Sequence, residues 1–463
     1  MRVCHGYAAV FDDPNLVSAA GLAPVLALAE RAGLHRLVAD RLTVPGAGGN
    51  ASVKISSLVG GMVGGADSID DMNLLRHGGM GRLFGGVRAP STLGTFLRAF
   101  TFGHVRQLDA VAADLLAALS RHTPLLPGAD QIAYVDVDDT VKATYGYAKQ
   151  GAGYGYSGVK GLNALIATVS SPTAAPVIVG TRLRRGATNS ARGAARLVAD
   201  AIVTARRAGG GTGRAPGGLV VVRADSAFYN HDVIAAARRR GARFSVTARH
   251  DQAVVRAIAG IEETAWVPIR YPNAIWDQDE QRWVSDAEVA ETDYVAFTSR
   301  LQAQQVQGRL IVRRVRRLNN TSTKGQGELL PAYRHHAVFT DSPLGMLQAE
   351  AAHRGHAIIE QVHADLRAGP LAHLPSGRFA VNGAWLVCAA MAFNLTRAAG
   401  TLASAFHAKA TTATIRAQLI TVPGRLARSA RRLTLHLPAD WPWEHAWQQL
   451  HDAVAGLPPP RAA

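Results

Sequence analysis

The chain has 463 residues, of which 50 are Lys or Arg and 34 are Asp or Glu, so its formal net charge is +16 and its sequence pI is about 10.5. This length exceeds one ordinary hydrophobic core, which predicts several structural units, and the charge favours a polyanionic partner such as nucleic acid. The only cysteines, Cys4 and Cys388, exclude a disulfide framework and a cysteine zinc site.

The sequence indicates a cytoplasmic protein without a membrane partner. The first residues lack an apolar signal core, and the acids Asp12 and Asp13 follow early. The most apolar run, residues 379–393, contains Asn382 and is shorter than the roughly 20 residues that cross a bilayer. We therefore predict that this run is a buried helix.

Residues 1–125 are expected to form a helical N-terminal region. From residue 16 to about residue 120, apolar residues recur at intervals of three and four, with breaks at 45–49, 78–81 and 89–90. This pattern predicts a bundle of short helices that binds DNA or mediates dimerisation. Simple packing against the rest of the protein is the alternative, because the sequence has no clear helix-turn-helix signature.

Residues 126–255 are expected to form the first part of a core. Three apolar strands come first, at 132–137, 162–169 and 176–183, with short turns between them. A helix at 190–207, a strand at 219–223, a helix at 231–240 and a strand at 244–248 follow. This order is that of an α/β protein with an RNase H-like core.

The rest of the chain departs from that order. Residues 256–340 predict a β-rich insertion, with short strands at 266–269, 294–299, 309–315 and 337–340. Residues 341–400 predict the final helices of the core, the first running from about 343 to 368. Residues 401–463 are rich in arginine, and we expect them to form a basic C-terminal tail.

Acidic residues interrupt two of the predicted core strands. Because side chains alternate along a strand, Asp136 and Asp138 are expected on one face, whereas Asp139 is expected to begin the departure from the strand. Asp225 ends the strand at 219–223, where an ionised acid is costly unless it binds a cation or receives hydrogen bonds. Such carboxylates on a rigid scaffold are what two-metal phosphoryl transfer requires. Capping of the following turn is the alternative role for Asp225.

These blocks resemble the signature motifs of the DDE transposases of bacterial insertion sequences, in the IS-four-like group with a β-strand insertion and closest to the IS-thirteen-eighty family. The resemblance covers about residues 90–435. The matching residues are Asp136, Asp138, Thr140 and Gly146 in the first block, Arg185, Gly186 and Asn189 after it, Asp225 to Phe228 in the second block, Glu360 in the third, and Asn382, Trp385 and Phe393 to Leu395 in the closing helix.

The resemblance implies a catalytic triad of Asp138, Asp225 and Glu360 that holds two Mg²⁺ or Mn²⁺ ions, with Asp136 as the alternative to Asp138. It also implies a homodimer that cleaves the terminal inverted repeats of double-stranded DNA and joins them to target DNA, on the bacterial nucleoid. A nuclease without strand transfer and an inactive, domesticated DNA-binding relative are the alternatives.

Several further residues are candidate DNA contacts. The family's final helix carries Tyr, Arg, Glu and a basic residue at set intervals, and here those positions hold His353, His356, Glu360 and Arg367. Arg354 or the histidines are expected to replace the missing arginine. Trp276 or Trp283 in the insertion could stack on a flipped base, and the arginines of the tail could bind phosphates. These tail arginines include Arg425 and Arg428.

We expect no nucleotide cofactor. Residues 153–158 match the dinucleotide-binding pattern of glycines, but they lead into a predicted strand where that motif requires a helix.

Overall fold

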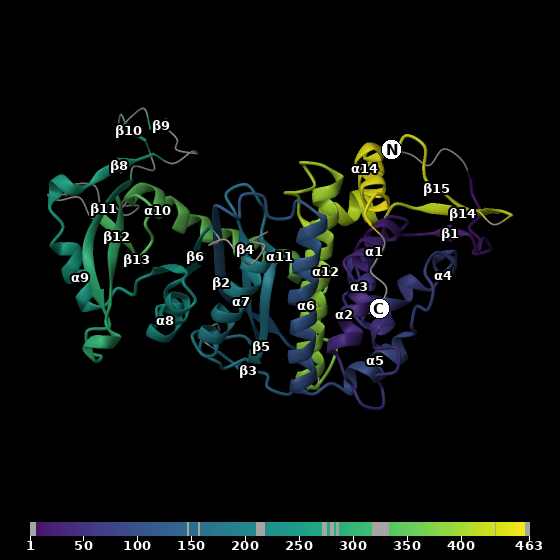
Figure 1. Ribbon diagram of the computed structural model, residues 1–463, viewed down its shortest axis with the longest axis horizontal. Helices are drawn as coiled ribbons and strands as arrows, with labels where there is room; N and C mark the ends of the chain where they lie inside the picture. Colours follow the sequence, from purple (N-terminus) through teal and green to yellow (C-terminus); the bar gives the residue numbers. More distant parts are fainter. Residues whose placement is uncertain are drawn as a thin grey trace.

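The computed structural model describes residues 6–145, 148–155, 158–209, 218–270, 276–277, 282–283, 287–316, 333–430 and 432–458. The molecule is elongated (Figure 1), with the strands of the insertion at one end, a central sheet in the middle and a helical body at the other end. Both termini lie at the helical end. The candidate acids therefore belong to the middle of the molecule.

The central sheet confirms the predicted order of strands and helices. Its strands are β2 (Ile132–Ala143), β4 (Lys160–Ser170), β5 (Val177–Arg185), β6 (Leu219–Ala224) and β7 (Arg243–Thr247), and its helices are α7 (Ala194–Ala208) and α8 (His231–Arg239). The strands lie in the order β5-β4-β2-β6-β7, with β2 antiparallel to β4 and parallel to β6. The short strand β3 (Gly153–Tyr154) pairs with β4. One prediction is wrong: β2 does not end near Val137, so Asp139 stays within the strand and points to the opposite face.

The insertion extends this same sheet. Its strands β8 (Val267–Ile269), β11 (Ala287–Ala296), β12 (Val306–Arg316) and β13 (Tyr333–Thr340) are antiparallel neighbours. Strand β13 also pairs with β7, placing Phe339 opposite Val246. The helix α9 (Gln252–Ala259) and the small pair β9 (Trp276–Asp277) and β10 (Arg282–Trp283) complete it. The sequence predicted a β-rich segment, and its continuity with the core comes from the structure.

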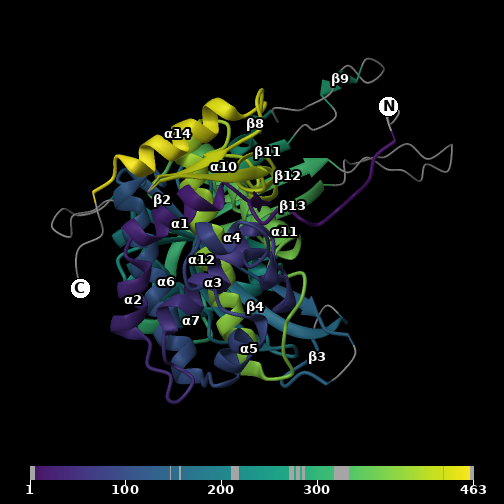
Figure 2. The ribbon, with the colours of Figure 1, turned by 90° about the vertical axis from the view of Figure 1, so that its right-hand side faces the viewer.

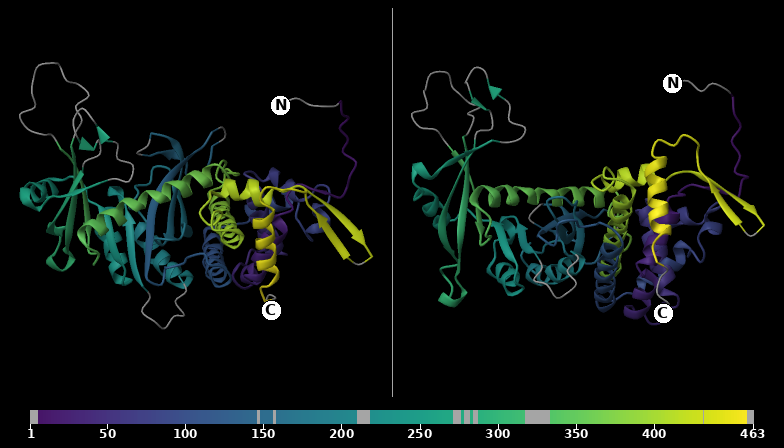
Figure 3. Two further views of the ribbon diagram at one scale, coloured as in Figure 1. Left: turned by 90° about the horizontal axis from the view of Figure 1, so that it is seen from above. Right: turned by 45° about the horizontal axis from the view of Figure 1, so that its top comes forward.

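The helix expected from about residue 343 to residue 368 is present in two parts. Helix α10 (Met346–Arg354) leads through a 3-10 turn (Gly355–Ala357) into α11 (Ile358–Arg367). Figure 3 shows these parts as one nearly continuous rod that runs along the molecule from the insertion, across the central sheet, to the helical body. This rod carries Glu360 over the face of the sheet that bears Asp136 and Asp138.

The helical body is formed by the N-terminal and C-terminal segments of the chain, which lie side by side (Figure 2). Its helices are α1 (Leu22–Arg31), α2 (Leu34–Arg41), α3 (Ala51–Gly64), α4 (Met80–Leu83), α5 (Pro90–Arg98), α6 (Phe102–His122), α12 (Phe379–Ala403), α13 (Thr412–Ile415) and α14 (Glu444–Ala455), with a 3-10 segment (Asp70–Leu75) and a π-helical turn (Arg416–Ile420). Helix α12 is long and apolar enough to cross a membrane, yet 89% of its most apolar window is buried inside the protein. Packing against α6, α3 and β5 accounts for its composition.

The basic C-terminal region folds against the helical body. Strands β14 (Gly424–Ser429) and β15 (Arg432–His436) form a hairpin, and β14 pairs with β1 (Leu16–Val17) near the other end of the chain. Trp447 and Leu450 of α14 are buried in the common core.

Candidate active site

Asp136 lies on β2 and is fully buried. Arg223, opposite it on β6, donates from Nε and Nη2 to the two carboxylate oxygens at 2.7 and 2.6 Å, and His356 donates to the same carboxylate at 3.0 Å. Burial acts to raise the pKa of Asp136, but the Arg223 charge and these hydrogen bonds lower it below its ordinary value. Because Asp136 is fully buried and Arg223 already neutralises its charge, this geometry favours Asp138 over Asp136 as a metal ligand.

Asp138 lies two residues further along the same face of β2, with a side chain that is 16% exposed. His363 Nε2 lies 3.2 Å from one carboxylate oxygen, and the backbone amide of Asp139 donates to the other at 2.7 Å. Burial opposes ionisation, but the hydrogen bond and charge of His363 hold the pKa of Asp138 below its ordinary value. Asp138 is therefore an anion that still reaches solvent.

Asp225 follows β6 directly and lies beside Asp138. The parallel register that pairs Val137 with Ala224 places these two acids next to each other where the paired segments end. One Asp225 oxygen accepts a hydrogen bond from the Ala227 amide at 2.9 Å, so the residue does cap the turn that follows. Burial first, and the charge of Asp138 second, raise the pKa of Asp225. A cation between the two carboxylates would relieve that repulsion.

Glu360 lies in the first turn of α11, is exposed, and makes no hydrogen bond or ion pair with the described part of the chain. At about 100° per residue, it lies about 40° around the helix from His356 and about 60° from His363. Those histidines contact Asp136 and Asp138 respectively. Glu360 therefore lies at the solvent edge of the helix stripe that faces the acids.

The donor types at this site fit a hard divalent cation, which prefers carboxylate oxygens. Within the described ranges, however, no three His, Cys, Asp or Glu side chains lie close enough together to hold a metal ion. The structure thus brings Asp138 and Asp225 together and leaves Glu360 outside their cluster. Completing the predicted set of ligands requires Glu360 to approach from the edge of α11.

The sequence of the chain matches the model of one known protein family. The family model described as transposase DDE domain group 1 matches residues 7–459. The chain belongs to this family of DDE transposases. A search of curated proteins found no match. Because the match extends from end to end, the helical body, the insertion and the C-terminal hairpin all lie within the DDE transposase domain.

Two of the candidate DNA contacts of this DDE domain bind side chains of the central sheet. His353 places its ring nitrogens 2.9 Å from the hydroxyls of Ser245 and Thr247 on β7, and burial, followed by the charge of His356, lowers its pKa to about 3. His356 holds Asp136, as described above. These contacts favour a role for both histidines in attaching the helix to the sheet.

The candidate arginines are more accessible. Arg354 donates to Glu350 at 2.9 Å with a side chain that is 34% exposed. Arg367 is exposed near Lys142, whose pKa is lowered by burial first and by the Arg367 charge second. On the hairpin, Arg425 contacts Asp13 at 3.1 Å and Arg428 donates to a neighbouring backbone carbonyl. We retain these arginines as candidate phosphate contacts.

The tryptophans of the insertion fall into two groups. Trp276 and Trp283 are paired across β9 and β10, but their side chains lie outside the described residues. Trp266 is buried, with the Arg314 guanidinium 4.3 Å from its ring centroid, so it serves the core of the insertion.

Three residues escaped the sequence analysis. Arg223 and Arg184 are buried arginines in apolar strands, and His363 lies one turn after Glu360. Arg184 pairs with Asp139 and donates to the carbonyls of Ser190 and Arg192 at 2.7 and 2.9 Å. The available signal was chemical, because a buried arginine requires an acidic partner somewhere in the fold.

The motif at Gly186 has a packing explanation. A Cβ at this glycine would lie 2.1 and 2.3 Å from the carbonyl oxygens of Gly161 and Gly153, so no larger residue fits there. The resemblance had singled out Gly186 and Asn189 without indicating this role.

Proposed function

We propose that this DDE domain is an active transposase with an RNase H-like core, which cleaves the ends of an insertion sequence and joins them to target DNA. The observation that carries the proposal is the pair of acids Asp138 and Asp225, set side by side on adjacent parallel strands of a group 1 DDE domain. Glu360 is the third member of the proposed set. Bacterial origin and membership of the IS-thirteen-eighty family remain part of this proposal.

Each residue has a distinct task. Two Mg²⁺ or Mn²⁺ ions, when bound, would supply Lewis-acid stabilisation to the attacking and leaving oxygens of the scissile phosphate. His363 keeps Asp138 ionised and oriented. The Ala227 amide orients Asp225. Glu360 closes the set from the solvent side, where the DNA has access.

The substrate and assembly follow from the same reaction. The net charge of +16 suits double-stranded DNA. Joining two ends to one target requires two active sites, so we expect a homodimer on paired terminal inverted repeats, acting at the bacterial nucleoid in the cytoplasm.

Three conservative variants test the proposal. Asp138→Asn, Asp225→Asn and Glu360→Gln should each reduce Mg²⁺-dependent nicking of end DNA on the order of 10⁴-fold, because each removes a ligand charge but little volume. The matched control is Asp139→Asn, since Asp139 is adjacent in sequence but points to the opposite face of β2. It should retain metal-dependent nicking.

A second assay separates the alternatives. With pre-cut ends and a plasmid target, the wild-type chain should yield joined products; nicking without joining would indicate a nuclease. Binding of end DNA with no metal-dependent nicking would indicate an inactive DNA-binding relative. Full nicking activity in the Asp225 variant would overturn the proposed site.

A further inference from the structure

Arg223 attaches the junction between α10 and α11 to the central sheet, together with His353 and His356. Its guanidinium holds Asp136 through two hydrogen bonds of 2.7 and 2.6 Å and also donates from Nη1 to the carbonyl oxygen of Ala352, in the last turns of α10. The same guanidinium lies 4.2 Å from the ring centroid of Tyr134. One side chain of β6 thus connects β2, β6 and the helix.

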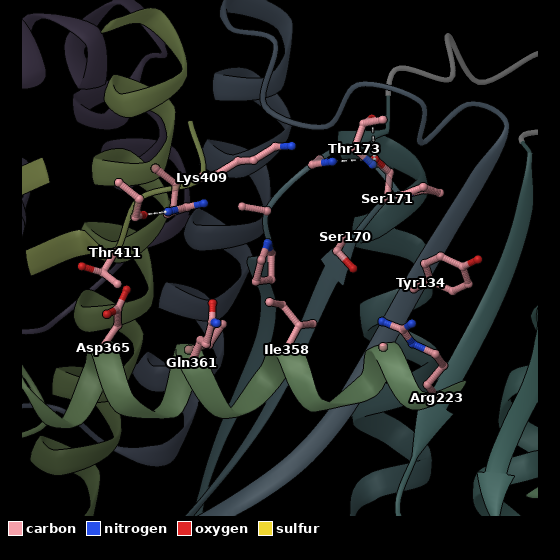
Figure 4. A pocket seen from close by; sticks show the side chains of 18 of the residues that line it. Tyr134, Ser170, Ser171, Thr173, Arg223, Ile358, Gln361, Asp365, Lys409 and Thr411 are labelled. Carbon is pink, nitrogen blue, oxygen red and sulfur yellow. Dashed lines mark hydrogen bonds between the residues drawn. The ribbon is translucent and has the colours of Figure 1, made fainter. Parts of the chain in front are cut away.

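A cavity beside α11 makes the contact between Arg223 and the helix important for holding the helix in place. On the flank that faces α12, the helix borders a cavity of about 450 Å³. Figure 4 shows Ile358, Gln361 and Asp365 along the cavity wall that α11 provides, with Arg223 and Tyr134 at one end. Ile358 lies about 160° around the helix from Glu360, so the cavity and the candidate site occupy opposite flanks. Direct packing against α12 therefore does not fix the helix on this flank.

Gly355 shows how closely the junction approaches Arg223. A Cβ at this position would lie 2.8 Å from Arg223 Nη1, which is closer than real Cβ contacts allow. The guanidinium cannot move aside without losing Asp136 or Ala352, because both are its hydrogen-bond partners. Because residue 355 has no side chain, the 3-10 turn can lie directly against the Arg223 guanidinium.

We propose that Arg223 and Asp136 form a positioning clamp that sets the distance of Glu360 from Asp138 and Asp225. This inference rests on the proposed function, since it assigns the clamp to assembly of the carboxylate set. Asp136 lies on the strand that carries Asp138, Arg223 is two residues before Asp225, and Ala352 precedes Glu360 by about two helical turns. The clamp therefore joins the backbones of all three ligands without supplying a ligand.

The chain offers a matched control for this idea. Arg184, which is buried, and Asp139 form a second arginine–aspartate pair on the opposite face of β2. Arg184 holds the loop at residues 189–192 and, within the described part of the chain, makes no hydrogen bond or ion pair with α10 or α11. A variant of Arg184 therefore reports the general cost of disturbing such a pair in this sheet.

Two variants loosen the clamp by different routes. Gly355→Ala keeps both charged residues and displaces the Arg223 guanidinium. The double variant Asp136→Asn with Arg223→Gln removes both charges, so no buried charge is left alone, and shortens the donor that reaches Ala352. Both should raise the Mg²⁺ concentration for half-maximal nicking by about 10- to 100-fold, as outer-shell changes around metal sites do. Arg184→Lys should leave that concentration unchanged, and metal-free DNA binding should persist in all three.

Hydrogen–deuterium exchange without metal or DNA gives a readout independent of activity. The amides of residues 356–363 should exchange faster in Gly355→Ala and in the double variant than in the wild type and in Arg184→Lys. Wild-type exchange and an unshifted Mg²⁺ requirement in both clamp variants would overturn the clamp, as would an equal shift in Arg184→Lys. If the wild-type chain shows no metal-dependent nicking, the proposed function fails, and the exchange rates alone decide whether the clamp exists.

Discussion

The two faces of β2 use the same pair of residue types for different purposes. On one face, Asp136 binds Arg223, which also holds the helix that carries Glu360. On the other face, Asp139 binds Arg184, which holds the loop leading into α7. Both pairs stabilise the sheet, but only the first connects it to the element that the chemistry requires.

The two faces of β2 also differ in the acids that are not paired with an arginine. Asp138 continues the row of Asp136 and meets Asp225 on the next strand, and their mutual repulsion contributes to the raised pKa of Asp225. On the face of β2 that carries Asp139, the other strand residues near it are Val135 and Val137, which are buried in the hydrophobic core. An acid in this sheet is therefore a functional candidate when no buried cation already neutralises it.

The largest effect that would sharpen this comparison is on stability. Asp136→Ala leaves Arg223 buried with an uncompensated charge, and the free energy of unfolding should fall by about 3–5 kcal/mol. Asp139→Ala should cost less, roughly 1–3 kcal/mol, because Arg184 keeps Asn163 and the loop carbonyls as acceptors. Chemical denaturation of both variants at neutral pH measures the difference. Equal losses would show that the two faces are energetically equivalent.

The sequence predicted the order of the core elements because each one carries its own local signal. Strand β4 is a nearly continuous apolar run, and Asn230 caps α8 through its side chain. The alternation of Asp136 and Asp138 on one face also followed from strand geometry. The partner of Asp136 could not be predicted this way, because Arg223 is 87 residues away and only the folded sheet brings it opposite.

The same limit applies to strand pairing between the two end regions of the chain. The C-terminal arginines have the composition of a solvated tail, yet Gly424 pairs with Val17 to form a sheet. Pairing between strands that are far apart in the sequence produces no periodic hydrophobic pattern in either strand. Glu360 was found through its family spacing alone, since an exposed helical glutamate has no local signature.

A smaller effect concerns His353, on the same side of the sheet as the clamp. Burial lowers its pKa to about 3, so the folded state binds fewer protons than the unfolded state between about pH 6.5 and pH 3. Stability should therefore fall as the pH drops through 6.5. Between pH 7.5 and pH 5.5 the loss from this residue should be about 1.4 kcal/mol. Urea denaturation of the wild type and of His353→Gln at both pH values isolates it, and an unchanged pH dependence in the variant would contradict the buried neutral ring.

The smallest effect on the fold concerns DNA. Arg425→Gln with Arg428→Gln alters an exposed hairpin, so the unfolding transition should stay unchanged. If both arginines contact phosphates, the slope of log K against log salt concentration for end DNA should fall by roughly 1.8. The matched control changes Arg196 and Arg239, which are exposed on α7 and α8 over the face of Asp139. An equal fall in the control pair would mean that a general loss of charge, and not a DNA contact of the hairpin, explains both results.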